Sequence, residues 1–235
     1  MGRSHPETGF AIQPPALRSV PVPSSALLAR LAPLTPVPGR PDLVAHHAPD
    51  VVALWQAWEE ECGGQQAVPF WATVWPAGQL LARVVQAEPA WVRGQTVLDL
   101  GCGSGVAGIA ALYAGATRVV AHDIDLVALA IAAQNARANA VELLLHGTPL
   151  LHAPCPARIT CILVGDLFYE RSTASALWAW LRTAHRQGVR VLIADACRPF
   201  APTAGVRCLW KERLATAWAW EGMHARTVRL LTLDV

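Results

Sequence analysis

The segment that most constrains this chain is Val97-Leu-Asp-Leu-Gly-Cys-Gly-Ser-Gly105. Residues that favour a β-strand lead into three glycines at alternate positions, and an apolar run with the length of a short helix follows from Val106 to Tyr113. Glycine is needed where a strand turns sharply into a helix, because the backbone there bends tightly or approaches a ligand closely. The pattern therefore predicts a strand, a ligand-binding turn and a helix, with the Asp99 carboxylate at the mouth of the turn.

Two nucleotide ligands suit such a turn. The loop that binds S-adenosylmethionine reads acidic-x-Gly-x-Gly-x-Gly, which is matched here by Asp99, Gly101, Gly103 and Gly105. A dinucleotide is the alternative, because Gly103 to Gly108 fits Gly-x-Gly-x-x-Gly and an acid, Asp123, follows about 20 residues on. A carboxylate beside a pyrophosphate would repel it, so Asp99 favours the sulfonium cofactor.

Composition predicts one substantial globular domain. The chain has 235 residues, of which 53% are hydrophobic and 15% charged, values typical of a well-packed protein. The net charge of +2 gives no case for electrostatic steering to nucleic acid, and the arginines are scattered without a basic run. The longest uncharged stretch, residues 100–117, is broken by five glycines, so no membrane span is predicted.

The six cysteines show neither a Cys-x-x-Cys pair nor zinc-finger spacing, so no metal site is predicted and reduced thiols in a cytoplasmic protein are expected. Residues 1–41 form a Pro/Ala-rich segment that we expect to be partly disordered, because its eight prolines between Pro14 and Pro41 exclude long helices. Its single acid, Glu7, also suits an organelle transit peptide, which makes the mitochondrial matrix the alternative location.

Residues 42–68 are predicted to form an N-terminal helical extension, with a helix over 50–61 that ends at Gly63-Gly64. A loop from Val68 to Gln79 feeds a further helical run over 80–86. Trp71 and Trp75 in this loop either fill a core, as most tryptophans do, or form an aromatic wall against a cationic sulfonium.

The remaining chain alternates strands and helices. Strands are predicted at 97–100, 118–123, 141–145, 159–164, 189–194, 208–214 and 227–235, and helices at 106–113, 126–138 and 172–186. Asp125 is placed to cap the helix that begins at Leu126. Repeating strand–helix units with apolar strands predict an α/β fold of the Rossmann-like, doubly wound type. Its sheet should be seven-stranded and mostly parallel, with an antiparallel C-terminal strand.

Ligands of such a sheet bind outside the carboxyl ends of its strands. Four strands present a carboxylate there: Asp99, Asp123, Asp166 and Asp195. Asp123 can accept hydrogen bonds from both hydroxyls of a ribose. If the ligand is S-adenosylmethionine, Asp166 and Tyr169 are candidates for holding an acceptor amine behind its methyl group. Alternatively, they are only a turn-forming aspartate and a buried tyrosine at the end of a strand.

The stretch from Pro69 to Val235 resembles the class I, seven-strand S-adenosylmethionine-dependent methyltransferases, and within them the electron-transfer flavoprotein β-subunit lysine methyltransferases. The resemblance is carried by Pro69-Phe-Trp-Ala-x-x-Trp-Pro-x-Gly-Gln79, the glycine motif, His122-Asp-Ile-Asp125, Gly165-Asp-Leu-Phe-Tyr169 and Arg198-Pro199. It makes residues 69–235 a methyltransferase domain and predicts methyl transfer to an amine, with a protein lysine as substrate and a small-molecule amine as the alternative.

The resemblance also assigns residues. Cofactor binding is implied for Trp71, Trp75, Gly78, Asp99, Gly101, Gly103, Gly105, Asp123 and Ile124, and a catalytic role for Asp166 and Tyr169. The implied protein partners are the flavoprotein β subunit or a ribosomal stalk protein. No acid lies between Glu142 and Asp166, which leaves a backbone carbonyl for the adenine amino group.

Overall fold

The computed structural model describes residues 20–216 and 225–234. Its helices are α2 (Ser25–Leu31), α3 (Val51–Cys62), α4 (Pro76–Ala87), α5 (Val106–Tyr113), α6 (Leu126–Ala138) and α7 (Arg171–Arg186), with short 3-10 turns η1 (Phe70–Ala72) and η2 (Pro89–Trp91). Its strands are β1 (Leu34–Val37), β2 (Arg40–His46), β3 (Thr96–Leu100), β4 (Arg118–His122), β5 (Leu144–His146), β6 (Cys161–Gly165), β7 (Arg190–Asp195), β8 (Val206–Ala215) and β9 (Ala225–Leu233). Residues 1–19 of the segment 1–41, for which partial disorder is predicted, lie outside the described residues, as does Val235.

The main sheet confirms the predicted fold class. Its seven strands run in the order β5-β4-β3-β6-β7-β9-β8, and β9 pairs antiparallel with both of its neighbours. The other pairs of neighbouring strands, from β5 to β7, are all parallel. The strand order reverses between β3 and β6, which is where ligands bind in doubly wound sheets.

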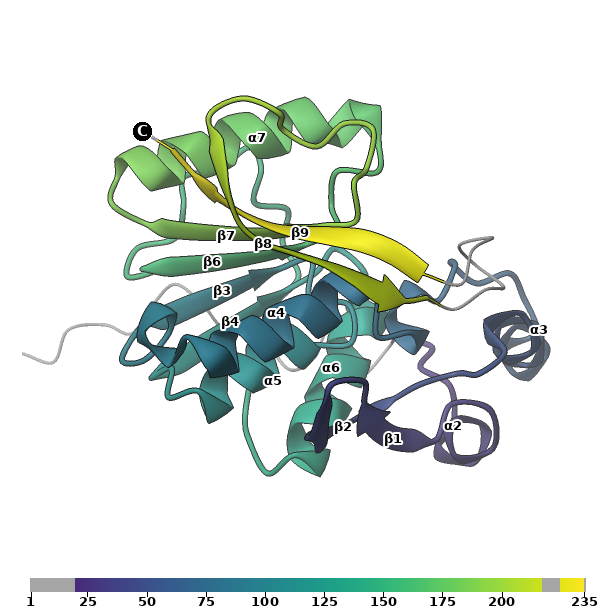
Figure 1. Cartoon of the computed structure of the whole chain (residues 1–235). Helices are drawn as coiled ribbons and strands as arrows, with labels where there is room; N and C mark the ends of the chain where they lie inside the picture. The colour runs from purple at the N-terminus through teal and green to yellow at the C-terminus, as the bar shows by residue number, and fades with distance from the viewer. Residues whose placement is uncertain (1–19, 217–224, 235) are drawn as a thin grey trace, which may run out of the picture.

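Helices cover both faces of this sheet, with α4 and α5 on one side and α7 on the other (Figure 1). Alternation along β3 divides its side chains between two cores: Val97 belongs to the cluster under α4 and α5, and Leu98 and Leu100 belong to the cluster under α7. Both faces of the strand are thus buried, as its continuous apolar sequence requires.

Helix boundaries follow from local chemistry. The Asp125 carboxylate accepts a hydrogen bond of 2.8 Å from the Val127 amide, which confirms it as the N-cap of α6. Helix α4 begins at Pro76 rather than at Leu80, because proline is pre-organised for the first helical position. Strand β5 begins later than predicted because the Val141 amide closes the end of α6 by donating to the Ala136 carbonyl.

Residues 20–62, here called the N-terminal unit, contain α2, the β1–β2 hairpin and α3. The hairpin turns at Pro38-Gly39, where Gly39 adopts a φ of 75°. The sequence analysis did not predict this hairpin, because the proline content indicated only extended and turn conformations. A third apolar cluster joins α2 and α3 to the outer side of α6, so the unit packs on the sheet domain (Figure 1).

Candidate active site

The turn between β3 and α5, residues 101–105, is the centre of the candidate site. All three of its glycines have a positive φ, a backbone conformation that residues with a side chain rarely adopt. A Cβ on Gly101 would lie 2.6 Å from Leu167, and one on Gly105 would lie 2.8 Å from the Ala132 Cβ. A Cβ on Gly103 would meet nothing within 4 Å. Two glycines thus allow close packing, and the third leaves open space at the carboxyl edge of the sheet.

Asp123 holds this turn from the neighbouring strand. Its carboxylate accepts hydrogen bonds from the Gly103 amide at 2.9 Å and from the Asp125 amide at 3.0 Å. Burial raises the pKa of this carboxyl, and these backbone hydrogen bonds oppose the rise. Each oxygen keeps a second lone pair, and the side chain is partly exposed. Ile124 next to it is 73% exposed.

Asp99 lies beneath the turn, so the expectation of a carboxylate at its mouth is wrong. Its side chain is 2% exposed and accepts a hydrogen bond of 2.8 Å from the Gly108 amide in α5. The physical reason is the phase of β3, which points Asp99 to the same side as Val97, under α5. Burial raises the pKa of Asp99 to about 7. A direct contact between Asp99 and a ligand stays a prediction.

The two tryptophans of the loop before α4 have different surroundings. Trp71 is fully buried and packs edge-to-face on Trp58, with 5.9 Å between ring centroids. Of the two interpretations offered by the sequence, Trp71 therefore fits core filling. Trp75 is partly exposed and donates a hydrogen bond from Nε1 to the Phe70 carbonyl at 2.8 Å. Gly78, at the start of α4, has open space where a Cβ would be.

Asp166 ends β6 in a left-handed conformation, with a φ of 57°. Arg198 forms an ion pair with its buried carboxylate, and the guanidinium Nε lies 3.0 Å from both carboxylate oxygens. The Ala196 amide donates a further hydrogen bond to Oδ1 at 3.1 Å. Burial raises the pKa of Asp166, and the hydrogen bonds from Arg198 oppose that rise.

Three aromatic side chains form a row of ring contacts that starts at Tyr169, three residues after Asp166. Tyr169 is 53% exposed and Phe70 is 49% exposed, with 6.4 Å between their ring centroids. The Trp75 ring follows at 6.0 Å from that of Phe70. Phe70, Trp75 and Tyr169 are called the aromatic rim below. Phe168 between the two site residues is fully buried and anchors the turn.

The four predicted carboxylates belong to the carboxyl ends of their strands, but Asp99 and Asp195 are buried there. Asp166 and Asp195 pair with arginines that were not foreseen as partners. Besides Asp166 with Arg198, the fully buried Asp195 accepts a hydrogen bond of 3.0 Å from Arg229 of β9. The Arg198-Pro199 motif carried a signal for the first pair. Arg229 gave none, because its partner is set by the antiparallel register Asp195↔Arg229.

Comparison with known proteins identifies relatives that share part of this chain. The mouse electron transfer flavoprotein beta subunit lysine methyltransferase is 37% identical over 143 residues, which cover 60% of this chain and 56% of the mouse protein. The Caenorhabditis elegans homolog of that enzyme is 30% identical over 175 residues, which cover 67% of this chain and 70% of the relative. The chain belongs to this family. It spans little more than half the length of curated relatives such as the mouse protein.

Two other matches concern the glycine turn and the fold. The model of the ribosomal protein L11 methyltransferase (PrmA) family matches residues 80–156, which hold the glycine turn and Asp123. A candidate RNA methyltransferase from Pyrococcus horikoshii has the same fold, with a TM-score of 0.51, 14% identity, and coverage of 68% of this chain and 84% of that one. The dinucleotide interpretation of Gly103 to Gly108 finds no support among these relatives.

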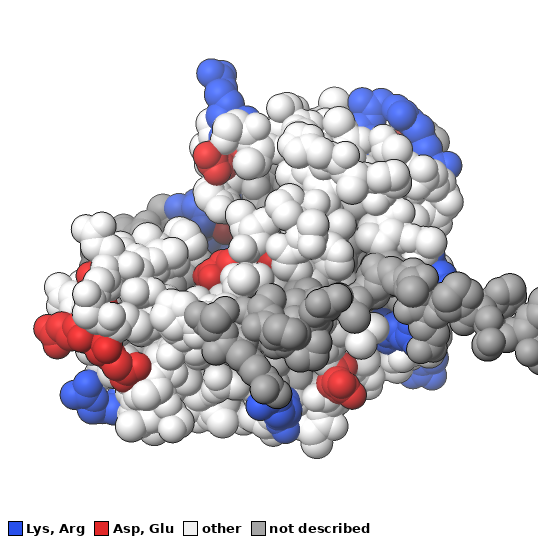
Figure 2. All heavy atoms as spheres, turned by 180° about the vertical axis from the view of Figure 1, so that it is seen from behind, with Lys and Arg blue, Asp and Glu red and all other residues white. Residues whose placement is uncertain are grey.

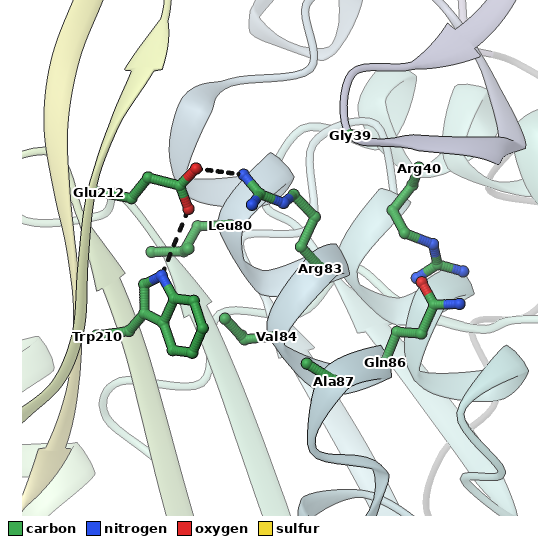
Figure 3. Close-up of a pocket in the computed structure, with 9 residues that line it drawn as sticks. All are labelled: Gly39, Arg40, Leu80, Arg83, Val84, Gln86, Ala87, Trp210 and Glu212. Carbon is green, nitrogen blue, oxygen red and sulfur yellow. Dashed lines mark hydrogen bonds and ion pairs between the residues drawn. The ribbon is translucent and has the colours of Figure 1, made fainter.

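Other features of the chain involve residues outside the candidate site. A hollow of about 290 Å³ lies between α4, β8 and the hairpin turn, and Glu212 there bonds both Arg83 and Trp210 (Figure 3). Charges of both signs are scattered over the face seen in Figure 2. Within residues 20–216 and 225–234, no group of three potential metal ligands occurs, and no helix has the length and apolarity of a membrane span.

Proposed function

We propose that this protein is an S-adenosylmethionine-dependent methyltransferase that transfers a methyl group to the ε-amine of a lysine in a protein. The observation that carries the proposal is the contact between the glycine turn and the Asp166–Tyr169 turn, where Leu167 fills the space that a Cβ on Gly101 would need. A loop suited to the cofactor and a loop suited to an amine therefore share one edge of the sheet.

The residues of the turn fit the cofactor. Open space at Gly103 and Gly78 leaves room for a ligand against the backbone, and the partly exposed Asp123 has lone pairs left for two ribose hydroxyls. Ile124 offers an exposed apolar surface for an adenine ring. Asp99 supports the turn through Gly108. When bound, S-adenosylmethionine supplies an electrophilic methyl group on a sulfonium.

The amine is handled by the neighbouring turn. Asp166, fixed by Arg198, offers a carboxylate acceptor that orients the amine and receives its hydrogen bond. The aromatic rim has exposed rings that suit the aliphatic stem of a lysine and attract its cationic end. An unprotonated amine is required for attack, and a positive charge nearby disfavours its protonation.

The relatives support a protein as substrate. Their names identify the beta subunit of electron transfer flavoprotein as the target of the animal enzymes and ribosomal protein L11 as that of the PrmA family. We therefore propose that subunit or a ribosomal stalk protein as the substrate of this chain. A cytoplasmic, reducing compartment is proposed with it, because the exposed cysteines Cys62, Cys197 and Cys208 form no disulfide within the described part of the chain.

Calorimetric titration with S-adenosylhomocysteine tests the cofactor site. The wild type should bind, the Asp123→Ala variant should bind at least about tenfold more weakly because hydrogen bonds to a charged group are lost, and Asp166→Asn should bind as the wild type does. A wild type that fails to bind would end the proposal.

Transfer of labelled methyl groups in a lysate tests the acceptor. Label on a protein band that Asp166→Asn abolishes is the expected result, with mass spectrometry to identify the lysine. Label on a small metabolite alone would instead establish a small-molecule N-methyltransferase.

A further inference from the structure

Asn135 of α6 is a fully buried polar side chain with no part in the site described above. Its Nδ2 donates a hydrogen bond of 2.9 Å to the carbonyl of Ser104, inside the glycine turn. Its Oδ1 accepts a hydrogen bond of 2.9 Å from the amide of His46 in β2. One amide group thus joins the N-terminal unit to the turn that suits the cofactor.

The bond to Ser104 acts at the centre of the turn. Ser104 lies between Gly103 and Gly105, both at positive φ. Gly105 also packs so closely on Ala132 of α6 that a Cβ would lie 2.8 Å from the Ala132 Cβ. Ala132 and Asn135 are three residues apart and therefore on one face of α6. That face holds the turn by a steric contact and by a directional hydrogen bond.

The bond to His46 is one of a pair of similar contacts. One turn further along α6, Asn139 accepts from the Val44 amide at 2.9 Å and donates to the Val44 carbonyl at 2.7 Å. The side chain of Asn139 reaches the same strand but, among the described residues, makes no hydrogen bond to the glycine turn. It also donates to the Asn135 backbone carbonyl at 2.7 Å. The chain therefore offers a matched comparison for Asn135.

We propose that Asn135 is a positioning residue that couples the N-terminal unit to the cofactor turn, so that β2 helps to set the affinity for the cofactor. The inference rests on the proposed function, because it takes the glycine turn as the cofactor site. Coupling of this kind is reciprocal: what β2 does for the cofactor, the bound cofactor does for β2.

The test compares two isosteric substitutions, Asn135→Asp and Asn139→Asp. In each, one carboxylate oxygen still accepts from the amide of β2, and the other replaces an NH₂ donor by an acceptor. In Asn135→Asp that acceptor faces the Ser104 carbonyl and repels it, whereas in Asn139→Asp it faces the carbonyls of Val44 and Asn135. Affinity for S-adenosylhomocysteine is measured by calorimetry, and thermal stability is measured alongside to show that both variants are folded at the temperature used.

Asn135→Asp should weaken binding by about fivefold or more, which is the lower range of coupling between sites. Asn139→Asp should stay within about twofold of the wild type, because the hydrogen bonds of that side chain go to Val44 and to the Asn135 carbonyl and leave the bond to Ser104 intact. Equal affinities in the wild type and Asn135→Asp would overturn the inference, and so would equal losses in both variants. A wild type that does not bind S-adenosylhomocysteine is a different outcome, because it refutes the proposed function itself.

Hydrogen exchange on the wild type keeps the inference testable if Asn135→Asp does not fold. Addition of S-adenosylhomocysteine should slow exchange of the His46 amide, which donates to Asn135, by at least about fivefold. The Val189 amide, which donates to the Ala184 carbonyl at the end of α7 on the other face of the sheet, should exchange at an unchanged rate. An unchanged His46 rate in a protein that binds the ligand would refute the coupling.

Discussion

Replacement of Asp99 by asparagine should stabilise the protein at alkaline pH. The carboxyl is 2% exposed, and burial is the largest cause of the rise in its pKa from 3.8 to about 7, with a smaller contribution from the charge of Asp123. Each unit of this rise in pKa means that the ionised carboxylate costs the folded state about 1.4 kcal/mol. The ionised carboxylate therefore costs about 4 kcal/mol above pH 7.

The direction of the pH dependence follows from the raised pKa. The folded protein holds the Asp99 proton more tightly than the unfolded chain, so the stability from this group is complete below about pH 4 and is lost as the pH rises to about 7. Asparagine stays neutral and can still accept the hydrogen bond from Gly108 through Oδ1. Between pH 5 and pH 8, the unfolding free energy of Asp99→Asn relative to the wild type should rise by about 3 kcal/mol.

Urea unfolding of both proteins at pH 5 and pH 8 measures this change. Asp42→Asn is the matched control, because a side-chain hydrogen bond from Arg40 lowers the pKa of Asp42. Its contribution is lost only as the pH falls through a value below 3.8, so that variant should differ from the wild type by the same amount at both pH values. If Asp99→Asn behaved like the control, Asp99 would be ionised throughout, and the argument from burial would fail.

Two further substitutions test the site by stability. Gly105→Ala should cost about 3 kcal/mol, because its Cβ would lie 2.8 Å from that of Ala132 at a φ of 76°, whereas Gly63→Ala, at a φ of 66° with nothing within 4 Å, should cost about 1 kcal/mol in urea unfolding. Arg198→Met should cost about 3 kcal/mol at pH 8 by leaving the Asp166 carboxylate without its ion pair. The hydrogen bonds from Arg198 oppose the rise in the pKa of Asp166, so their loss should raise that pKa further and the cost should shrink as the pH is lowered. A cost that does not change with pH in urea unfolding would contradict this.

The fold could be predicted because its signals are local. Glycines in the turn after a strand, an acid that caps a helix and apolar runs between turns fixed β3, α5 and the start of α6 within a few residues. The parallel topology then follows from the handedness and length of the connections. The partners of Asp166 and Asp195 depend instead on which distant strand lies beside them.

Two errors of detail have physical causes that the sequence contains. Asp99 alternates with Leu98 and Leu100, so its direction follows from the phase of the strand once one face is assigned to α5. The β1–β2 hairpin has a Pro-Gly turn signal at 38–39, with Leu43 and Ala45 buried in alternation beyond it. The surrounding prolines obscured this pattern, although the two-stranded sheet tolerates Pro36 and Pro41 in strands that are both edges.

Helix α6 connects the N-terminal unit to the glycine turn. The helix is apolar on nearly every side, and a helix of that kind is stable only when it is buried all round. Leu129 and Ala132 face the sheet core, whereas Val127 and Ile131 face the cluster of the N-terminal unit, so the predicted boundary at residue 69 separates two segments that share one buried helix. Because Asn135 on that helix bonds both His46 and Ser104, the unit that covers α6 also supports the glycine turn.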